Sequence, residues 1–349
     1  MFKYSANFCS NSLKRIAIKI CLVTFLGTLF FACTNPSSAQ QDPAVDPNDL
    51  REHDHAAETL KVKESDRQLF AAAKRVLQLS KIEIDSQIDD LKIPAYLFAP
   101  LDARKNSHPA LVWVYGGIHD RFGTNYFPFI KEATDRGFVV IAPEYRGATG
   151  YGEEYFNAID YGGYEVNDIL SAANHLSESV SEVDSKRIGV IGWSHGGYIS
   201  LLSVTREKNP FVCAVAFVPV SNLVFRMAYK GPEYQKTFIN QKRIGGLPHQ
   251  RRQVYIERSP VYHVDKLKVP LHVQVATNDK DVEFVESEML VNALRAKKPK
   301  LAEAVVLKDP ANGHYFNRQV DLKTLTRRDT ADQIDSWNRT WMFLDEHLK

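Results

Sequence analysis

The chain has 349 residues, of which 44% are hydrophobic and 25% are charged. This is ordinary globular composition, and it excludes a wholly disordered, collagen-like or polytopic membrane protein. The formal net charge is +2, which gives no reason to expect a nucleic-acid partner. Single α/β domains often reach about 250 residues, so the length does not require two large domains.

A basic segment followed by an apolar one opens the chain. Residues 16–32 are apolar except for Lys19, and their uninterrupted core, residues 20–32, is shorter than the ~20 residues that span a bilayer. This pattern predicts an export signal peptide over residues 1–32. Residues 29–33, Leu-Phe-Phe-Ala-Cys, resemble a bacterial lipoprotein box, in which Cys33 would be diacylated and become the mature N-terminus.

An ordinary signal-peptidase site after Ala39 is the alternative, because Ser37 and Ala39 give the small-x-small pattern. The lipoprotein interpretation is favoured, since Cys33 has no evident disulfide partner and Cys213 lies in an apolar run typical of a buried strand. We therefore expect a protein exported from the cytoplasm, either anchored to a membrane by lipid or free in the periplasm. Residues 33–60 are rich in Pro, Ser, Gln and Asp and are predicted to be a disordered tether.

Residues 61–349 alternate between the strand and helix patterns. The pattern begins with a helix over 66–79 and two extended runs, 81–85 and 92–98. Strands then follow at 110–115, 138–142, 187–192, 212–218, 271–276 and 304–307, with helices at 126–135, 165–177, 196–206, 284–297 and 331–348. Short, almost continuous apolar strands are typical of a parallel sheet buried on both faces. The pattern predicts one α/β domain with a doubly wound, mostly parallel sheet and helices on both faces.

The strongest motif is Gly-Trp-Ser-His-Gly at residues 192–196. This G-x-S-x-G directly follows a predicted strand and opens a predicted helix, which is the context that a nucleophilic serine requires. The tight turn would lift the Ser194 hydroxyl above the sheet and aim it at a helix N-terminus, which favours developing negative charge. Ser194 is the candidate nucleophile.

A nucleophilic serine needs a base, and the base needs a carboxylate that orients it. In this architecture the chain order is Ser, then Asp or Glu, then His. Asp279 follows the strand 271–276 and is the candidate acid, with Asp281 as its competitor two residues on. His314 follows the last strand and is the candidate base.

The negative charge that forms on the substrate oxygen needs hydrogen-bond donors. By position, the backbone N–H of His195 is one donor. The loop after strand 110–115, which begins Tyr115-Gly116-Gly117, should supply the other. An aromatic side chain that closes a strand end is one interpretation of Tyr115. No metal or organic cofactor is needed for this chemistry.

These motifs together resemble the prolyl oligopeptidase (S9) family of serine hydrolases, in particular its catalytic α/β-hydrolase domain without the β-propeller. Residues 192–198 resemble the nucleophile segment, and residues 279–282 (Asp-Lys-Asp-Val) resemble a D-x-x-V-P motif, which favours Asp279 over Asp281. The remaining matches are 145–152 (Tyr-Arg-Gly-Ala-Thr-Gly-Tyr-Gly), 163–168 (Gly-Tyr-Glu-Val-Asn-Asp) and 313–316 (Gly-His-Tyr-Phe).

The resemblance implies an α/β-hydrolase fold, a Ser194–His314–Asp279 triad and an oxyanion role for the Tyr115 hydroxyl. It also places Leu223, Phe225 and Tyr229 where the family builds its specificity pocket, and it suggests an ion-pair role for Arg146 and Asp168. The chain departs from the family pattern at Glu283 and Ile118, where prolines are usual.

The function expected from these residues is an exported serine hydrolase that cleaves small peptide or acyl-peptide substrates through a Ser194 acyl-enzyme. A carboxylesterase acting on small or carbohydrate-linked acyl esters is the alternative. A binding protein that retains the fold without catalysis is a third interpretation, and the complete triad argues against it. The sequence leaves the acyl group, the leaving group and the oligomeric state open.

Overall fold

The computed structural model describes residues 53–349, beginning with helix α1 (His55–Ala73). The side chain of Asp54 caps this helix, because its Oδ1 accepts a hydrogen bond from the backbone N–H of Ala57 at 2.9 Å. Residues 55–60 are therefore helical, and the predicted tether boundary at residue 60 is wrong. The predicted signal peptide and Cys33 lie outside the described residues.

Eight strands form the main sheet in the order β1-β2-β4-β3-β5-β6-β7-β8. The β1–β2 and β2–β4 pairs are antiparallel, and all the others are parallel. The strands are β1 (Gln78–Asp85), β2 (Lys92–Ala99), β3 (His108–Val114), β4 (Val139–Pro143), β5 (Val183–Trp193), β6 (Cys213–Phe217), β7 (Leu271–Ala276) and β8 (Ala302–Leu307). The predicted doubly wound, mostly parallel sheet is confirmed. It brings the carboxyl ends of β3, β5, β6, β7 and β8 to one edge, where sites form in such sheets.

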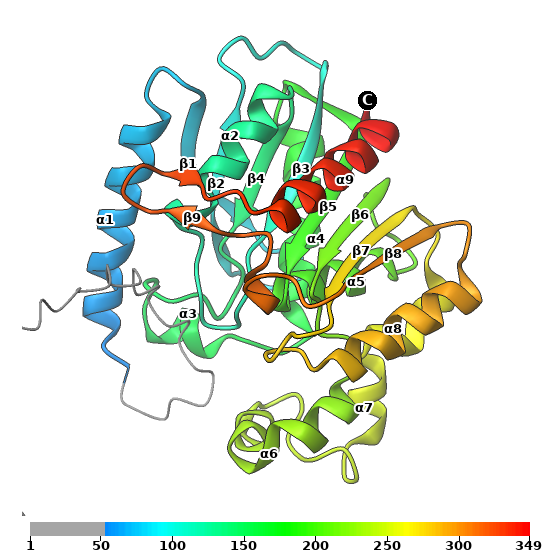
Figure 1. Ribbon diagram of the computed structural model, residues 1–349. Coiled ribbons are helices and arrows are strands. Elements are labelled where there is room, and N and C mark those ends of the chain that lie inside the picture. Colours follow the sequence, from blue (N-terminus) through cyan, green and yellow to red (C-terminus); the bar gives the residue numbers. More distant parts are fainter. Residues whose placement is uncertain (1–52) are drawn as a thin grey trace, which may run out of the picture. The chain divides into compact units, whose positions relative to one another are not determined.

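Helices cover both faces of the sheet (Figure 1). On one face α2 (Phe127–Asp135) packs beside α9 (Ala331–Leu348), with the rings of Phe129 and Trp337 stacked 4.7 Å apart. The other face carries α4 (Tyr164–Ser179), α5 (His195–Val204) and α8 (Phe284–Lys297). The shorter elements are η1 (Thr124–Tyr126), α3 (Glu153–Asn157), α7 (Arg252–Glu257), η2 (Pro260–Lys266), η3 (Gly313–Tyr315), β9 (Val320–Asp321) and β10 (Thr326–Arg327).

The segment after β6 holds a helix that the sequence analysis did not predict. Helix α6 (Leu223–Asn240) is two helices joined at Gly231, which has φ of 78° immediately before Pro232. The Gly-Pro pair resembles a helix stop, because proline cannot donate the next helical hydrogen bond and glycine readily leaves helical geometry. In the orientation of Figure 1, α6 and α7 lie below the sheet. None of the helices within residues 53–349 is long and apolar enough to span a membrane.

Three tryptophans form the centre of the core beside the candidate site. Trp193 is the last residue of β5, and its ring centroid lies 4.9 Å from that of Trp113 and 5.8 Å from that of Trp337. The indole N–H groups of Trp193 and Trp337 both donate to Asn317, at 3.1 Å and 2.8 Å. The loop that carries Asn317 is therefore tied directly to the strand that precedes Ser194.

The predicted ion pair between Arg146 and Asp168 is present and buried. Arg146 Nη2 lies 2.7 Å from Asp168 Oδ1, and the Arg146 backbone N–H donates to Asp168 Oδ2 at 2.9 Å. A second carboxylate, Asp89, lies 2.8 Å from Arg146 Nη1. Because Asp168 is fully buried, losing Arg146 would leave its carboxylate without a compensating charge.

Glu144 is fully buried just after β4, and burial raises its pKa to about 8. The backbone N–H of Phe122 donates to both carboxylate oxygens, at 3.2 Å and 3.1 Å, which offsets only part of the desolvation. The folded protein thus holds a proton on Glu144 over a pH range in which the unfolded chain has lost it. A group of this kind makes the folded state less stable as pH rises from about 4.5 to about 8.

We expect Glu144→Gln to remove this loss of stability. The amide still accepts the Phe122 hydrogen bond and never ionises, so the variant should exceed the wild type in free energy of unfolding above pH 8, by at most about 5 kcal/mol. Below about pH 4.5 the difference should shrink toward zero. Urea unfolding at pH 4.5 and pH 9 measures both values, and an equal difference at the two pH values would contradict the assignment.

Candidate active site

Ser194 occupies a strained turn between β5 and α5. Its backbone has φ of 51° and ψ of −115°, a conformation that residues other than glycine rarely adopt. The neighbouring glycines permit this turn, because a Cβ on Gly192 would lie 2.3 Å from the Gly196 carbonyl oxygen and a Cβ on Gly196 would lie 2.2 Å from that of Tyr115. The turn leaves Ser194 partly exposed between two fully buried segments.

His195 begins helix α5, directly after Ser194. At the first helical position the backbone N–H has no acceptor within the helix, so it is free to donate to a ligand. The predicted oxyanion donor therefore lies at a suitable place in the backbone. The His195 side chain turns inward, with Nε2 3.3 Å from Glu165 Oε1, and burial lowers its pKa. It is consequently a packed, neutral imidazole rather than a candidate base.

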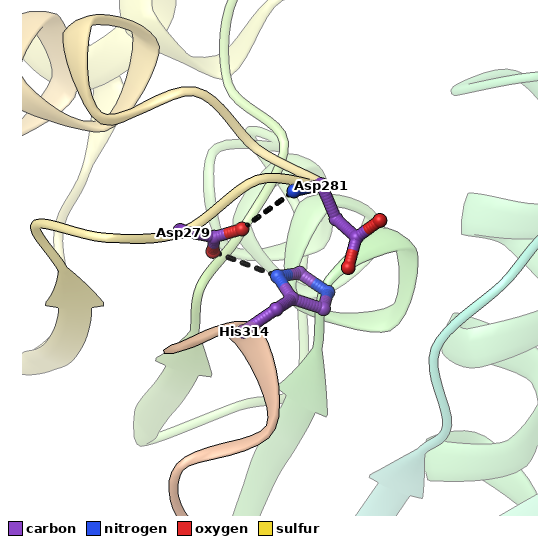
Figure 2. A group of neighbouring side chains, drawn as sticks. All are labelled: Asp279, Asp281 and His314. Carbon is purple, nitrogen blue, oxygen red and sulfur yellow. Dashed lines mark hydrogen bonds and ion pairs between the residues drawn. The ribbon is translucent and has the colours of Figure 1, made fainter. Parts of the chain in front are cut away.

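The candidate base and acid form a direct pair (Figure 2). His314 Nδ1 donates to Asp279 Oδ2 at 2.7 Å, and both side chains are buried. The other oxygen of Asp279 accepts the backbone N–H groups of Asp281 and Val282, at 2.8 Å and 2.9 Å. Asp279 is thus held by its own loop, and it fixes the His314 ring with Nε2 free to act on Ser194.

Asp281 is the exposed neighbour of this pair. It shares no hydrogen bond with His314, although Asp279, Asp281 and His314 each offer one ligand atom within 4.8 Å of the other two. These three residues are the group that could hold a metal ion in the described part of the chain. Both oxygens of Asp279 already accept hydrogen bonds from the protein. The geometry therefore suits an orienting carboxylate, Asp279, better than a metal cage.

The three candidate triad residues follow strands β5, β7 and β8, whose carboxyl ends lie at the same sheet edge with β6 between β5 and β7. Ser194 follows β5, Asp279 follows β7 and His314 lies in η3 after β8. Within residues 53–349 no hydrogen bond joins the Ser194 hydroxyl to His314. Such bonds often shorten only when a substrate is bound, so the free geometry is compatible with a serine–histidine relay.

The backbone of Tyr115 lies beside the nucleophile, whereas its hydroxyl does not. Its ring is fully buried and stacks on the ring of Tyr145, with the two ring centroids 4.5 Å apart. Its hydroxyl is buried close to Glu144 and lowers the pKa of that carboxyl, while burial together with the charge of Glu144 raises the pKa of the hydroxyl itself. The predicted oxyanion role of the Tyr115 hydroxyl therefore stays a prediction, and it would require the ring to turn toward Ser194.

The predicted specificity residues lie on α6, which follows β6. Leu223 is fully buried and presents no surface to a substrate, whereas Phe225 and Tyr229 are partly exposed and lie 5.4 Å apart. Tyr229 is held by a buried ion pair, because Arg226 Nη1 donates to its hydroxyl at 2.6 Å and lies 3.3 Å from Glu286 Oε2. Sequence reasoning missed Arg226 and Glu286, which are 60 residues apart in the chain.

His272 on β7 and Cys213 on β6 have structural roles. His272 Nδ1 lies 2.9 Å from Glu303 Oε2 and its Nε2 lies 2.8 Å from Gln274, as expected for a packed strand histidine. Cys213 is a buried free thiol, and burial raises its pKa to about 12. A thiol with so high a pKa is protonated at neutral pH and unreactive.

The chain is similar in sequence to peptidases from several organisms. It is 29% identical to dipeptidyl aminopeptidase BIII of Pseudoxanthomonas mexicana over 250 residues, covering 68% of this chain and 35% of that protein. It is 28% identical to the human prolyl endopeptidase FAP over 246 residues, covering 67% of this chain and 31% of that protein. The chain thus spans about a third of the length of these relatives.

The fold is similar to the catalytic domains of solved peptidases. The Pyrococcus horikoshii acylaminoacyl peptidase superposes with a TM-score of 0.64 at 19% identity, covering 81% of this chain and 44% of that one. A puromycin-hydrolyzing peptidase of Mycobacterium tuberculosis gives a TM-score of 0.62 at 24% identity, covering 78% of this chain and 40% of that one. These likenesses confirm the predicted α/β-hydrolase fold. The family model of the prolyl oligopeptidase family matches residues 125–349, so the chain belongs to that family of serine hydrolases.

Proposed function

We propose that this protein is an exported serine hydrolase that cleaves peptide or acyl-peptide bonds through an acyl-enzyme on Ser194. The observation that carries the proposal is the buried 2.7 Å hydrogen bond between His314 and Asp279, at the sheet edge where the strained turn presents Ser194. Family membership and the names of the relatives, a dipeptidyl aminopeptidase and a prolyl endopeptidase, support amide substrates.

In the first half of the reaction, Ser194 Oγ attacks the substrate carbonyl carbon while His314 Nε2 takes the hydroxyl proton. Asp279 keeps the other proton on Nδ1 and stabilises the imidazolium that forms. The negative charge moves to the carbonyl oxygen, where the N–H of His195 at the start of α5 donates to it. His314 then protonates the leaving amine, and the carbon–nitrogen bond breaks.

The second half repeats these steps with water in place of the serine. His314 takes a proton from water, the resulting hydroxide attacks the acyl carbon, and His314 returns the proton to Ser194 Oγ as the ester bond breaks. The acid is released and the enzyme is restored. Every proton passes through one imidazole, so the orientation of His314 controls both halves.

The choice between the two aspartates can be tested directly. Asp279→Asn should lower kcat by about 10⁴-fold, because an amide holds the wrong imidazole tautomer and cannot stabilise the imidazolium. Asp281→Asn removes an equal charge from the same loop but no His314 hydrogen bond, and it should retain kcat within a few-fold. Steady-state kinetics of both variants give the comparison, and similar losses in the two variants would refute the assignment of Asp279.

Amide and ester hydrolysis can be separated by matched substrates. We expect Ser194-dependent cleavage of a peptidyl anilide, with kcat/KM within a few tens-fold of the value for the ester of the same acyl group. An acyl-enzyme mechanism with a competent general acid can expel an amine as well as an alcohol. The measurement is kcat/KM for both substrates, with Ser194→Ala as the blank.

Two other outcomes would change the conclusion. Turnover of the ester alone would make the protein a carboxylesterase on a peptidase-like scaffold. Absence of turnover with both substrates, together with no covalent adduct from a fluorophosphonate probe, would leave a binding protein that retains the hydrolase fold. An adduct present in the wild type and absent in Ser194→Ala identifies Ser194 as the reactive serine.

Export and lipid attachment form the second part of the proposal. They are supported by the basic and apolar segments over residues 1–32 and by the lipoprotein-like residues before Cys33. In a bacterial host that processes lipoproteins, mass spectrometry of the mature N-terminus should find a diacylated Cys33. An unmodified N-terminus at Gln40 would show ordinary signal cleavage instead, and an intact Met1 would refute export.

A further inference from the structure

Arg318 is a charged residue beside the nucleophile that the proposed mechanism does not use. It lies four residues after His314 on the same loop, and its backbone N–H donates to the Tyr315 carbonyl at 3.1 Å. Its Nη1 donates to the Tyr126 hydroxyl at 3.1 Å, and its guanidinium lies 5.0 Å from the Tyr315 ring. The side chain is thus held between the His314 loop and η1.

The distance from this guanidinium to Ser194 is limited by Gly116. A Cβ built on Gly116 would lie 3.3 Å from Ser194 Cβ and 3.5 Å from Arg318 Nη1, so these two atoms are at most 6.8 Å apart. Gly116 thus lies between the nucleophile and the arginine, in contact range of both. A ligand covalently bound to Ser194 would therefore extend into the neighbourhood of Arg318.

Most hydrogen-bonding capacity of Arg318 is unused. Its Nε is buried and has no partner among the described residues, and no carboxylate within residues 53–349 lies at ion-pair distance, 4.0 Å or less. Asp120 lies within electrostatic range: burial raises its pKa, and Arg121 and, to a smaller extent, Arg318 lower it. Buried polar groups are normally paired, and a guanidinium presents its N–H donors in a plane that matches a carboxylate.

The position of Arg318 relative to His314 indicates which half of the substrate it meets. In the proposed mechanism His314 protonates the leaving group, so the leaving group lies beside His314, on the loop that also carries Arg318. One peptide residue spans about 3.5 Å. The carboxylate of a single residue on the leaving side would therefore fall within the range that separates Ser194 from Arg318.

We propose that Arg318 binds a free carboxylate carried by the leaving group, so that the preferred peptides end one residue after the cleaved bond. This rests on the proposed acyl transfer through Ser194. In that step the carbon–nitrogen bond breaks, His314 supplies the proton to the leaving amine, and the carboxylate is unchanged. Arg318 is a specificity-determining residue that acts through substrate binding.

The test compares acyl peptides that end in alanine with their carboxamides. For the wild type we expect kcat/KM to be about 10- to 100-fold higher with the free carboxylate, mainly through KM, because a charge-assisted hydrogen bond is gained. Arg318→Gln should abolish this preference while keeping carboxamide turnover within a few-fold. Arg318→Lys should restore part of it. Arg328→Gln, at an exposed arginine paired with Asp321, is the matched control and should keep the preference.

A purely structural role for Arg318 predicts a different result. In that case Arg318→Gln would slow both substrates equally, and an equal kcat/KM of the wild type for the two would likewise overturn the proposal. The same comparison with acyl lactate and acyl lactamide, which are esters, separates this inference from the proposed function. A carboxylate preference seen only with the esters would uphold Arg318 and refute amide hydrolysis.

Discussion

The turn at Ser194 is the constraint around which the site is built. A side chain in this left-handed conformation is unfavourable by roughly 1–3 kcal/mol, and it persists only where the surroundings leave no alternative. Those surroundings are the backbone atoms of Gly196 and Tyr115, which approach so closely that no Cβ would fit at residues 192 and 196. The Ser194 N–H also donates to the Phe217 carbonyl at 2.9 Å, which anchors the turn to β6. The energy stored in the turn is thus offset by the packing of the parallel sheet.

A second tie joins the nucleophile to its base across the core. Trp193 precedes Ser194, and its indole N–H donates to the side chain of Asn317, three residues after His314. Asn317 is fully buried, and its carbonyl also receives the indole N–H of Trp337 on α9. A shift of the final helix would therefore move the His314 loop as well. This arrangement explains why Trp193 and Trp337 occupy these positions, where a leucine would leave the loop unanchored.

The surroundings of the triad differ in charge from one side to the other. On the α6 side, Arg226 is compensated by Glu286, while Lys230 is partly buried and has its pKa lowered by that burial. On the side of the His314 loop, Arg318 has no carboxylate partner among the described residues, and Asp281 is exposed beside His314. A partly buried charge that lacks a partner, such as Arg318, interacts more strongly with a bound substrate than an exposed charge does. The site is therefore suited to discriminating substrates by charge as well as by shape.

Much of the site could be predicted from local patterns in the chain. Strand burial and tight turns impose local residue requirements, so short-range spacing encodes the G-x-S-x-G turn and the order of Ser194, Asp279 and His314. It likewise encodes strand β7 and helices α8 and α9. Helix α6 was missed because its Gly231–Pro232 pair resembles a helix stop. The inward orientation of Tyr115 and the approach of Arg318 to Tyr126, 192 residues away, depend on how distant segments pack. Side-chain direction and charge pairing are set by neighbours in space, and spacing along the chain carries no information about them.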